Sequence, residues 1–180
     1  MIDVAACRAA RPWSRREMAM RVLWAAAHPL FRLSPRPLWG WRRALLRLFG
    51  ARVGCGAHVH PTARIAMPWN LSLGAFSAVG DGARLYALGP LRIGARATVS
   101  QGAYLCGGSH DLADPARALL KAPVTVGPDA WICADAFLGP GAVVGAGAVV
   151  GARAVVMGAV APGDRVAGNP ARSIREGTWN

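Results

Sequence analysis

The sequence predicts a mainly β protein: a parallel β-helix of hexapeptide repeats with an N-terminal helical segment and a short C-terminal helix. Three observations predict it: a six-residue repeat, a loop that interrupts the repeat, and an arginine-rich start of the chain. We expect a basic amphipathic helical segment over 1–50, the β-helix over 51–170 with an inserted loop at about 107–121, and a tail or helix over 171–180.

The six-residue repeat pairs a small residue with an aliphatic one two positions later, eleven times between Ala57 and Val156. A period of six fits neither the α-helix, with its period of about 3.6, nor the alternation of one long strand. It is typical of a chain that turns a corner every six residues. We expect the aliphatic residue inside a three-sided prism and the small one near a corner, where a larger side chain would collide with the next coil. The clearest pairs are Ala130 and Ile132, Ala136 and Leu138, Ala142 and Val144, Ala148 and Val150, and Ala154 and Val156.

The spacing of the coils locates the loop. The similar segments 71–74 and 91–94 lie 20 residues apart, and the next one, 124–127, follows after 33, which is 13 more than a coil needs. These surplus residues must leave the prism somewhere within 107–123. Long loops in compact repeat proteins are usually functional or disordered, so we look for chemistry there.

The first 50 residues hold ten arginines against Asp3 and Glu17, which is +8 of the net charge of +12. We expect two short helices, over 21–30 and 38–49, separated by prolines at 35 and 37. The segment is a cap over the open end of the β-helix, an anchor in peripheral contact with an anionic membrane, or both. The second helix has an apolar stripe that comprises Leu38, Trp41, Leu45, Leu48 and Phe49. Arg42, Arg43 and Arg47 lie outside this stripe.

Composition excludes several classes of protein. The four cysteines have no CxxC spacing, so we interpret them as structural thiols in a reducing, cytoplasmic compartment, at the inner face of the membrane if the anchor interpretation holds. No apolar run reaches the length of a signal peptide core or of a transmembrane helix. The basic charge suggests nucleic acid, but no nucleic-acid-binding motif accompanies it, so we expect no nucleic-acid partner.

Five strings, in this order and spacing, resemble the hexapeptide-repeat acyltransferases, in particular the colanic acid biosynthesis acetyltransferases and then the maltose and galactoside O-acetyltransferases. The resemblance runs from Arg42 to Arg175 and implies a left-handed β-helix, a homotrimer, and acetyl-CoA as the acetyl donor. The left hand is implied by the resemblance alone, because parallel crossovers are generally right-handed. The strings are ARIAMPWNL at 63–71, SHDLADP at 109–115, AWI at 130–132, GPG at 139–141 and VAGNPAR at 166–172.

The candidate catalytic residues are His110 and Asp111. Acetyl transfer from a thioester to a hydroxyl requires a base that removes the hydroxyl proton, and an imidazole, with a pKa near 6.5, suits that role. His110 is the only histidine of the loop, and it aligns with the family's general base. Asp111 or Asp114 is a candidate for fixing its tautomer, although either is equally well explained as a turn former.

Other site residues come from the resemblance. In the family the donor's pantetheine arm lies in a groove between subunits, and basic residues near the carboxyl end face the nucleotide phosphates. The matching positions are Trp131, Ala134, Ala152 and Met157 for the groove and Arg172 and Arg175 for the phosphates. For Trp131 an alternative explanation is that the side chain packs against a neighbouring subunit.

Both the donor side and the acceptor side depart from the family. On the donor side, relatives often carry Thr-Lys-Asp where this chain has 157–159, so a lysine that contacts the phosphates is missing. On the acceptor side, the asparagine that binds sugar hydroxyls in galactoside enzymes falls at Gly102. Tyr86 and Gln101 are our candidates for acceptor binding. His58 and His60 form an HxH pair, but the loop brings one histidine with no second a few residues on, so we expect no metal site.

These observations predict an acetyl-CoA-dependent O-acetyltransferase that acts on a sugar of a surface polysaccharide or of its lipid-linked precursor. Two alternatives remain open: N-acetylation of an amino sugar nucleotide by the same residues, and a non-catalytic β-helix scaffold. Binding of coenzyme A separates the enzyme from the scaffold.

Overall fold

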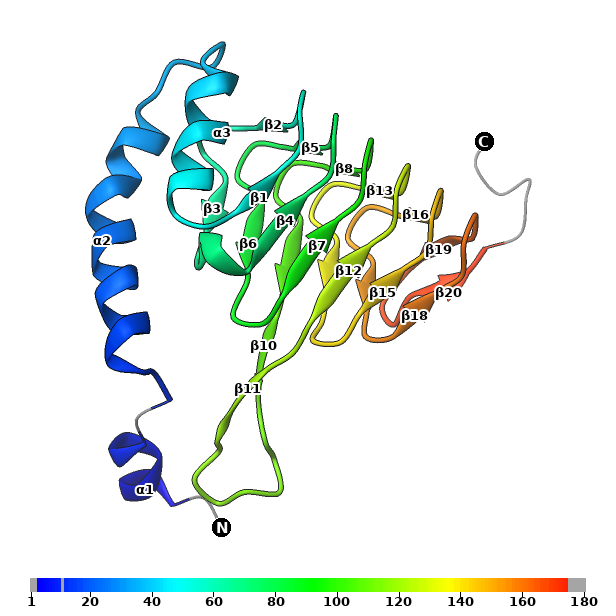
Figure 1. The fold of residues 1–180 in the computed structure, drawn as a ribbon. Helices are drawn as coiled ribbons and strands as arrows, with labels where there is room; N and C mark the ends of the chain where they lie inside the picture. Colours follow the sequence, from blue (N-terminus) through cyan, green and yellow to red (C-terminus); the bar gives the residue numbers. More distant parts are fainter. Residues whose placement is uncertain (1–2, 11, 175–180) are drawn as a thin grey trace.

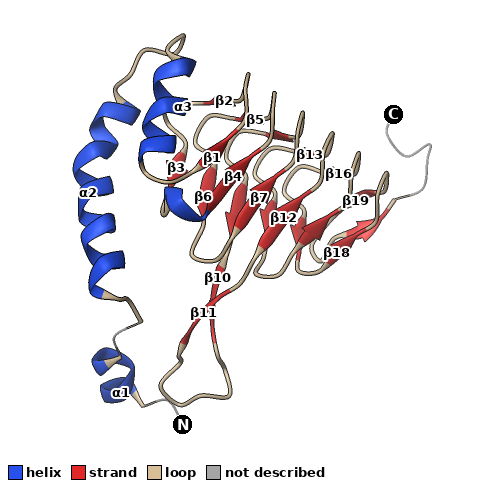
Figure 2. Cartoon of the chain, in the orientation of Figure 1, coloured by secondary structure: helices blue, strands red, loops and turns tan. Residues whose placement is uncertain are grey.

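The computed structural model describes residues 3–10 and 12–174, in which three helices lead into a regular coil of short strands (Figure 1). The helices are α1 (Val4–Ala9), α2 (Arg15–Arg32) and α3 (Trp39–Leu48). Three parallel sheets follow, one for each side of a prism (Figure 2). The predicted β-helix is therefore confirmed.

Each coil contributes one strand to each sheet, and the strands pair in parallel with those of the next coil. The first sheet comprises β1 (Arg52–Val53), β4 (Leu71–Leu73), β7 (Leu91–Ile93), β12 (Val124–Val126), β15 (Val143–Val144) and β18 (Ala159–Val160). The second comprises β2 (His58–Val59), β5 (Ala78–Val79), β8 (Thr98–Val99), β13 (Trp131–Ile132), β16 (Val149–Val150), β19 (Arg165–Ala167) and β20 (Arg172–Ser173). The third comprises β3 (Arg64–Ile65), β6 (Arg84–Tyr86), β9 (Tyr104–Cys106), β14 (Phe137–Leu138) and β17 (Val155–Val156).

The repeated pairs fill the interior of the prism. All eleven small residues are at most 1% exposed, and the aliphatic residues two positions later are at most 4% exposed. Each small residue stands just after a turn, as Ala148 does before β16. The one hydroxyl among them, Ser77, is satisfied because its Oγ donates a hydrogen bond to the Gly74 carbonyl at 2.8 Å. The six-residue pattern thus marks the interior correctly in every coil.

We expect Ala148→Leu to destabilise the fold by about 2 kcal/mol, because Ala148 is 0% exposed and extra methylenes in a tight core force neighbours to shift. Ala146→Leu is the matched control, since Ala146 is exposed at the corner two residues earlier. Denaturant titration of both variants measures the effect. Equal midpoints for the two variants would contradict the crowding at the interior position.

The N-terminal helices cover the open end of the first coil. Trp24 of α2 is buried, and its Nε1–H donates to the Ile65 carbonyl of β3 at 2.7 Å. The same indole packs edge-on against Phe31 and Phe49. Because Leu45 and Leu46 of α3 join this cluster, the helices extend the hydrophobic core beyond the prism. The cap interpretation of this segment is confirmed.

Several details of this segment differ from the prediction. Helix α2 begins six residues earlier than expected, because Ser14 and Glu17 form a reciprocal capping box at its N-terminus, and α1 was not predicted. The predicted apolar stripe of α3 has the wrong phase: Leu38, Trp41 and Leu48 are exposed, whereas Arg42 is fully buried.

Arg42 is buried because the backbone surrounds its guanidinium with acceptors. Its Nε–H donates to the Val59 carbonyl at 2.7 Å. Its other nitrogens donate to Ser34 Oγ at 2.8 Å and to the carbonyls of Pro35 and Arg36 at 2.9 and 2.5 Å. This side chain therefore ties the turn between α2 and α3 to the first coil.

The end of the chain also differs from the prediction. Where a C-terminal helix was expected, Arg172 and Ser173 form β20, which pairs antiparallel with β19. The rest of the predicted segment, 175–180, lies outside the described residues. Among the helices that the structure describes, none is long and apolar enough to cross a membrane.

Candidate active site

The inserted loop is a β-hairpin that projects from the prism between β9 and β12 (Figure 1). Its strands β10 (Gly108–His110) and β11 (Leu119–Lys121) pair antiparallel, with His110 opposite Leu119. At its root the Gly107 N–H donates to the Tyr86 carbonyl at 2.8 Å. The surplus residues therefore leave the prism where the coil spacing predicts.

His110 is exposed on the hairpin, and its Nδ1 lies 2.6 Å from the Arg117 carbonyl oxygen. A carbonyl oxygen only accepts hydrogen bonds, so Nδ1 must carry the proton. The neutral ring then presents an unprotonated Nε2, which is the form that accepts a proton from a substrate. The backbone of the hairpin thus holds His110 in the tautomer that a general base needs.

The two candidate aspartates shape the turn of the hairpin. The Asp111 carboxylate accepts from the Ala113 N–H at 2.9 Å. The Asp114 carboxylate accepts from the N–H groups of Ala116 and Ala118 at 2.9 and 3.1 Å. The orienting role that was considered for Asp111 belongs to the Arg117 carbonyl in the structure. No sequence pattern identifies a backbone carbonyl in this role.

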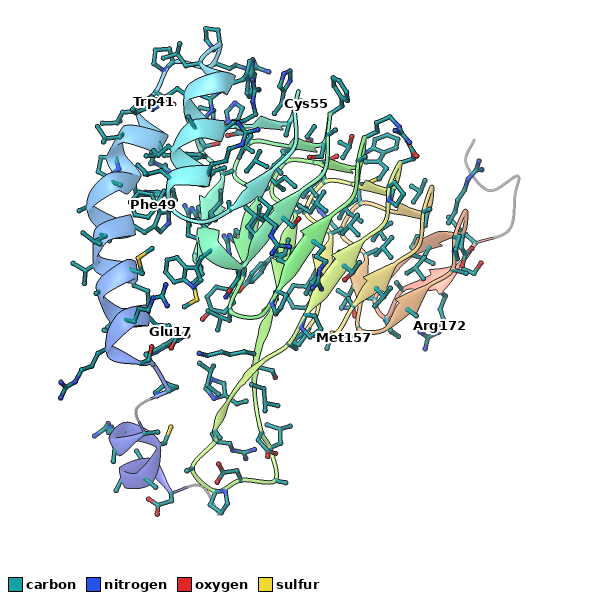
Figure 3. The ribbon with its side chains drawn as sticks, viewed as in Figure 1. Glu17, Trp41, Phe49, Cys55, Met157 and Arg172 are labelled. Atoms are coloured by element: carbon teal, nitrogen blue, oxygen red, sulfur yellow. The ribbon has the colours of Figure 1, made fainter. Side chains whose placement is uncertain are left out.

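The N-terminal segment contacts the hairpin at positions that the sequence does not predict. We call these contacts the hairpin clamp. Lys121 Nζ lies 2.9 Å from Glu17 Oε1 and 4.4 Å from the centroid of the Trp13 ring. Near the hairpin tip the Asp3 N–H donates to the Pro115 carbonyl at 2.9 Å. Figure 3 shows Glu17 at the end of α2 that faces the hairpin. The clamp joins residues 104 positions apart in the chain.

The clamp also explains the acidity of Glu17. The hydrogen bond from Lys121, with those from Ser14, lowers the pKa of Glu17 from 4.5 to about 2. Because the folded-state pKa is the lower one, the ionised carboxylate favours the folded state above about pH 4.5. This contribution falls progressively between about pH 4.5 and about pH 2 and is absent at lower pH.

We expect Glu17→Gln to loosen the hairpin, so that the Asp111 amide, which donates to the Ala118 carbonyl, exchanges several-fold faster with solvent. Hydrogen–deuterium exchange measures this change. Asp129→Asn is the matched control, because it breaks a surface pair with Arg96 of 2.6 Å that lies away from the hairpin. Unchanged hairpin exchange in Glu17→Gln would show that the clamp does not hold it.

The two acceptor candidates lie in different places. Tyr86 is beside the root of the hairpin, where a Cβ on Gly108 would come within 2.9 Å of Tyr86 Cε1. It lines a cavity of about 330 Å³ between α2 and the third sheet. Gln101 lines a separate groove of about 610 Å³ beside the second sheet, together with Trp39 and His58. Within one chain the structure does not bring Tyr86 and Gln101 together.

The predicted donor residues are on the outside of the later coils. Trp131 is 51% exposed, and its Nε1–H donates to Ser100 Oγ at 2.9 Å. Ala134 and Ala152 occupy the same corner of successive coils, where the Arg153 N–H donates to the Ala134 carbonyl. Exposed Met157 lines one cavity with Arg172 (Figure 3). Arg175 lies outside the described residues.

The histidine pair of the first coil is engaged within the fold. His58 stacks on Trp39 with ring centroids 4.5 Å apart. His60 Nδ1 lies 2.7 Å from Thr62 Oγ1 and 3.2 Å from an Asp81 carboxylate oxygen. Within residues 3–10 and 12–174, no three His, Cys, Asp or Glu side chains gather as a metal site.

No protein-family model matches the chain. It is 41% identical over 157 residues to the Escherichia coli (strain K12) protein described as "Putative colanic acid biosynthesis acetyltransferase WcaF", which covers 87% of this chain and 86% of that protein. The Shigella flexneri protein of the same description gives the same values.

Solved structures share the fold over almost the whole chain. The hexapeptide-repeat acetyltransferase VCA0836 of Vibrio cholerae in complex with acetyl-CoA has a TM-score of 0.84 at 23% identity, covering 92% of this chain and 91% of that one. A galactoside acetyltransferase in complex with coenzyme A also has a TM-score of 0.84, at 22% identity, covering 98% and 91%. At such identities the likeness concerns the fold alone.

Proposed function

The chain belongs to the hexapeptide-repeat acetyltransferases related to WcaF, and from this premise we propose that it transfers the acetyl group of acetyl-CoA to a sugar hydroxyl during the biosynthesis of a surface polysaccharide. The observation that carries the proposal is the state of His110. Its Nδ1 is held by the Arg117 carbonyl at 2.6 Å, and its Nε2 has no hydrogen-bond partner among the described residues.

The reaction needs one proton acceptor and no protein nucleophile, because the thioester is already activated. His110 Nε2 takes the proton of the sugar hydroxyl while the sugar oxygen attacks the acetyl carbon. The carbon–sulfur bond breaks, the thiolate of coenzyme A leaves, and the imidazolium returns its proton to the thiolate. An acetyl ester of the sugar and free coenzyme A are the products.

We propose that acetyl-CoA binds in a groove between two subunits of a homotrimer, along Trp131, Ala134, Ala152 and Met157. Arg172, with Arg175 beyond the described residues, would face the phosphates. The exposure of Trp131 and Met157 supports this placement, since neither side chain is covered by its own chain. Sedimentation velocity tests the trimer: we expect a species of about three times the 18.8 kDa chain.

The function is tested by incubating the protein with acetyl-CoA and sugars, both free and as nucleotide sugars, and measuring both the release of thiol and the acetylated product. We expect thiol and O-acetyl ester in equal amounts, with an ester that mild base removes. A base-stable amide formed on amino sugars would instead support N-acetylation. Failure to bind coenzyme A by calorimetry would leave the scaffold alternative.

We also propose that the outer face of α2 contacts an anionic membrane. Leu23, Leu30 and Leu33 are 56%, 58% and 81% exposed there, on a helix that also carries Arg15, Arg16 and Arg32. Exposed leucines beside arginines are typical of a helix that lies in the membrane interface, where each arginine contributes about 1 kcal/mol.

We expect Leu23→Ser with Leu30→Ser to weaken binding to vesicles of anionic lipid at least about tenfold, from the lost burial of two leucines. Vesicle co-sedimentation measures this. Leu112→Ser is the control, because Leu112 is 78% exposed on the hairpin. Substitution is preferable to truncation, since α2 also contributes the buried Trp24 and Phe31. Equal binding by all variants would leave α2 as a cap only.

A further inference from the structure

The cavity between α2 and the third sheet has a lining that suits one class of ligand. Its volume is about 330 Å³. Arg64 of β3, Arg84 of β6 and Tyr104 of β9 follow one another in register across the sheet, and Tyr86 and His28 also line it. It contains Tyr86, the acceptor candidate that lies next to the hairpin.

The two arginines of this cavity have no acidic partner among the described residues. Arg64 and Arg84 are directly opposite each other on neighbouring strands, an arrangement in which like charges repel. Within residues 3–10 and 12–174, neither guanidinium forms an ion pair, and no Asp or Glu lines the cavity. Burial, followed by nearby Arg32, lowers the pKa of His28. The charge of the cavity is therefore positive, and an anion would relieve the repulsion.

The geometry of the arginine pair favours two linked phosphates. Neighbouring strands lie about 4.8 Å apart, so the guanidinium groups can bind adjacent phosphates. Arginine also binds phosphate oxygens in pairs through its planar fork of N–H groups. A diphosphate offers oxygens to both forks at once.

The tyrosines add a hydrogen-bond donor and an aromatic wall. Tyr86 and Tyr104 meet edge to face with centroids 6.4 Å apart. Burial, followed by the neighbouring Cys106, raises the pKa of Tyr104 to about 12. Its hydroxyl thus stays protonated at neutral pH and can donate to an anion.

The cavity also lies within reach of the catalytic base. Tyr86 lines it, while its carbonyl accepts from Gly107 and its ring touches the position of Gly108. His110 is two residues further along β10, which at about 3.3 Å per residue is roughly 7 Å from Gly108. A sugar attached to a ligand in the cavity would extend along Tyr86 toward His110.

We propose that this cavity binds the acceptor through a diphosphate: Arg64 and Arg84 hold the two phosphates, and the attached sugar presents its hydroxyl to His110. The inference rests on the proposed function and narrows its substrate to sugar diphosphates, carried on either a nucleotide or a polyprenyl chain. Neutral free sugars would then be poor acceptors compared with their diphosphate-linked forms.

Isothermal titration calorimetry tests this with coenzyme A present in excess, so that the donor site is occupied. The probes are inorganic diphosphate, UDP-glucose, farnesyl diphosphate and glucose. We expect diphosphate to bind and glucose not to bind. Tighter binding of UDP-glucose would identify a nucleotide carrier, and tighter binding of farnesyl diphosphate a polyprenyl carrier. Absence of binding by all three diphosphates would overturn the proposal.

The decisive variant is the double substitution Arg64→Met with Arg84→Met, which we expect to weaken diphosphate binding by about 100-fold, roughly tenfold for each arginine. Arg52→Met with Arg92→Met is the matched control, since it removes the same charge from exposed positions of the first sheet. Equal losses in both double variants, or none in the first, would overturn the proposal. Arg64 and Arg84 are not among the residues proposed to bind acetyl-CoA. If the protein failed to bind acetyl-CoA, that result would therefore count against the proposed function and not against the diphosphate site.

Discussion

Replacement of His110 by alanine is expected to lower kcat for acetyl transfer by at least about 100-fold, the usual cost of losing a general base. Binding of acetyl-CoA and the melting temperature should hardly change, because the side chain is exposed and its one hydrogen bond, to the Arg117 carbonyl, lies within the hairpin. Steady-state kinetics and calorimetry on the same preparation measure these effects.

Asp111→Asn is the informative control for this experiment. An asparagine oxygen still accepts from the Ala113 N–H and keeps the turn, so we expect activity within a few-fold of the parent. A loss as large as that of His110→Ala would return the orienting role to the Asp111 carboxylate. Near-normal turnover in His110→Ala would overturn the assignment of the base itself.

The largest effect on stability is expected at Arg42. Replacement by methionine should lower the free energy of unfolding by at least about 3 kcal/mol, because hydrogen bonds to a charged group contribute about 1.5–3 kcal/mol each. The buried Val59 carbonyl and three partly buried acceptors would lose their donor. Burial lowers the pKa of the Arg42 guanidinium, because removal from water disfavours the charged form. Its hydrogen bonds offset this cost. Lysine should restore little, since a point charge lacks the fork that reaches several acceptors.

Denaturant titration checks this prediction against a neighbouring arginine. Arg43 is partly exposed and makes one hydrogen bond, to the Ala57 carbonyl at 3.1 Å, so Arg43→Met should cost less than about 1 kcal/mol. If both variants unfold at the same denaturant concentration, the buried network around Arg42 does not hold the cap on the first coil.

The sequence by itself determined the prism, because the information for it is local and repeated. An alanine that must fit inside a corner and a valine or leucine two residues later recur in every coil, so their spacing identifies the interior. The same periodicity locates the residues that do not fit, and therefore the hairpin with His110. The exposed face of α3 was harder to predict, since the buried Arg42 reverses the usual relation between charge and burial.

Only the tertiary structure decided the environment of His110 and the charge of the cavity beside it. The carbonyl that holds its Nδ1 is a backbone atom that every residue possesses, so no side-chain pattern marks it. The Glu17–Lys121 contact joins positions 104 residues apart, and the cavity that Arg64 and Arg84 line forms only where His28 of α2 lies beside the third sheet. Such contacts depend on which segments lie side by side in the folded chain. No local pattern in the sequence identifies these neighbours, because the segments are far apart along the chain.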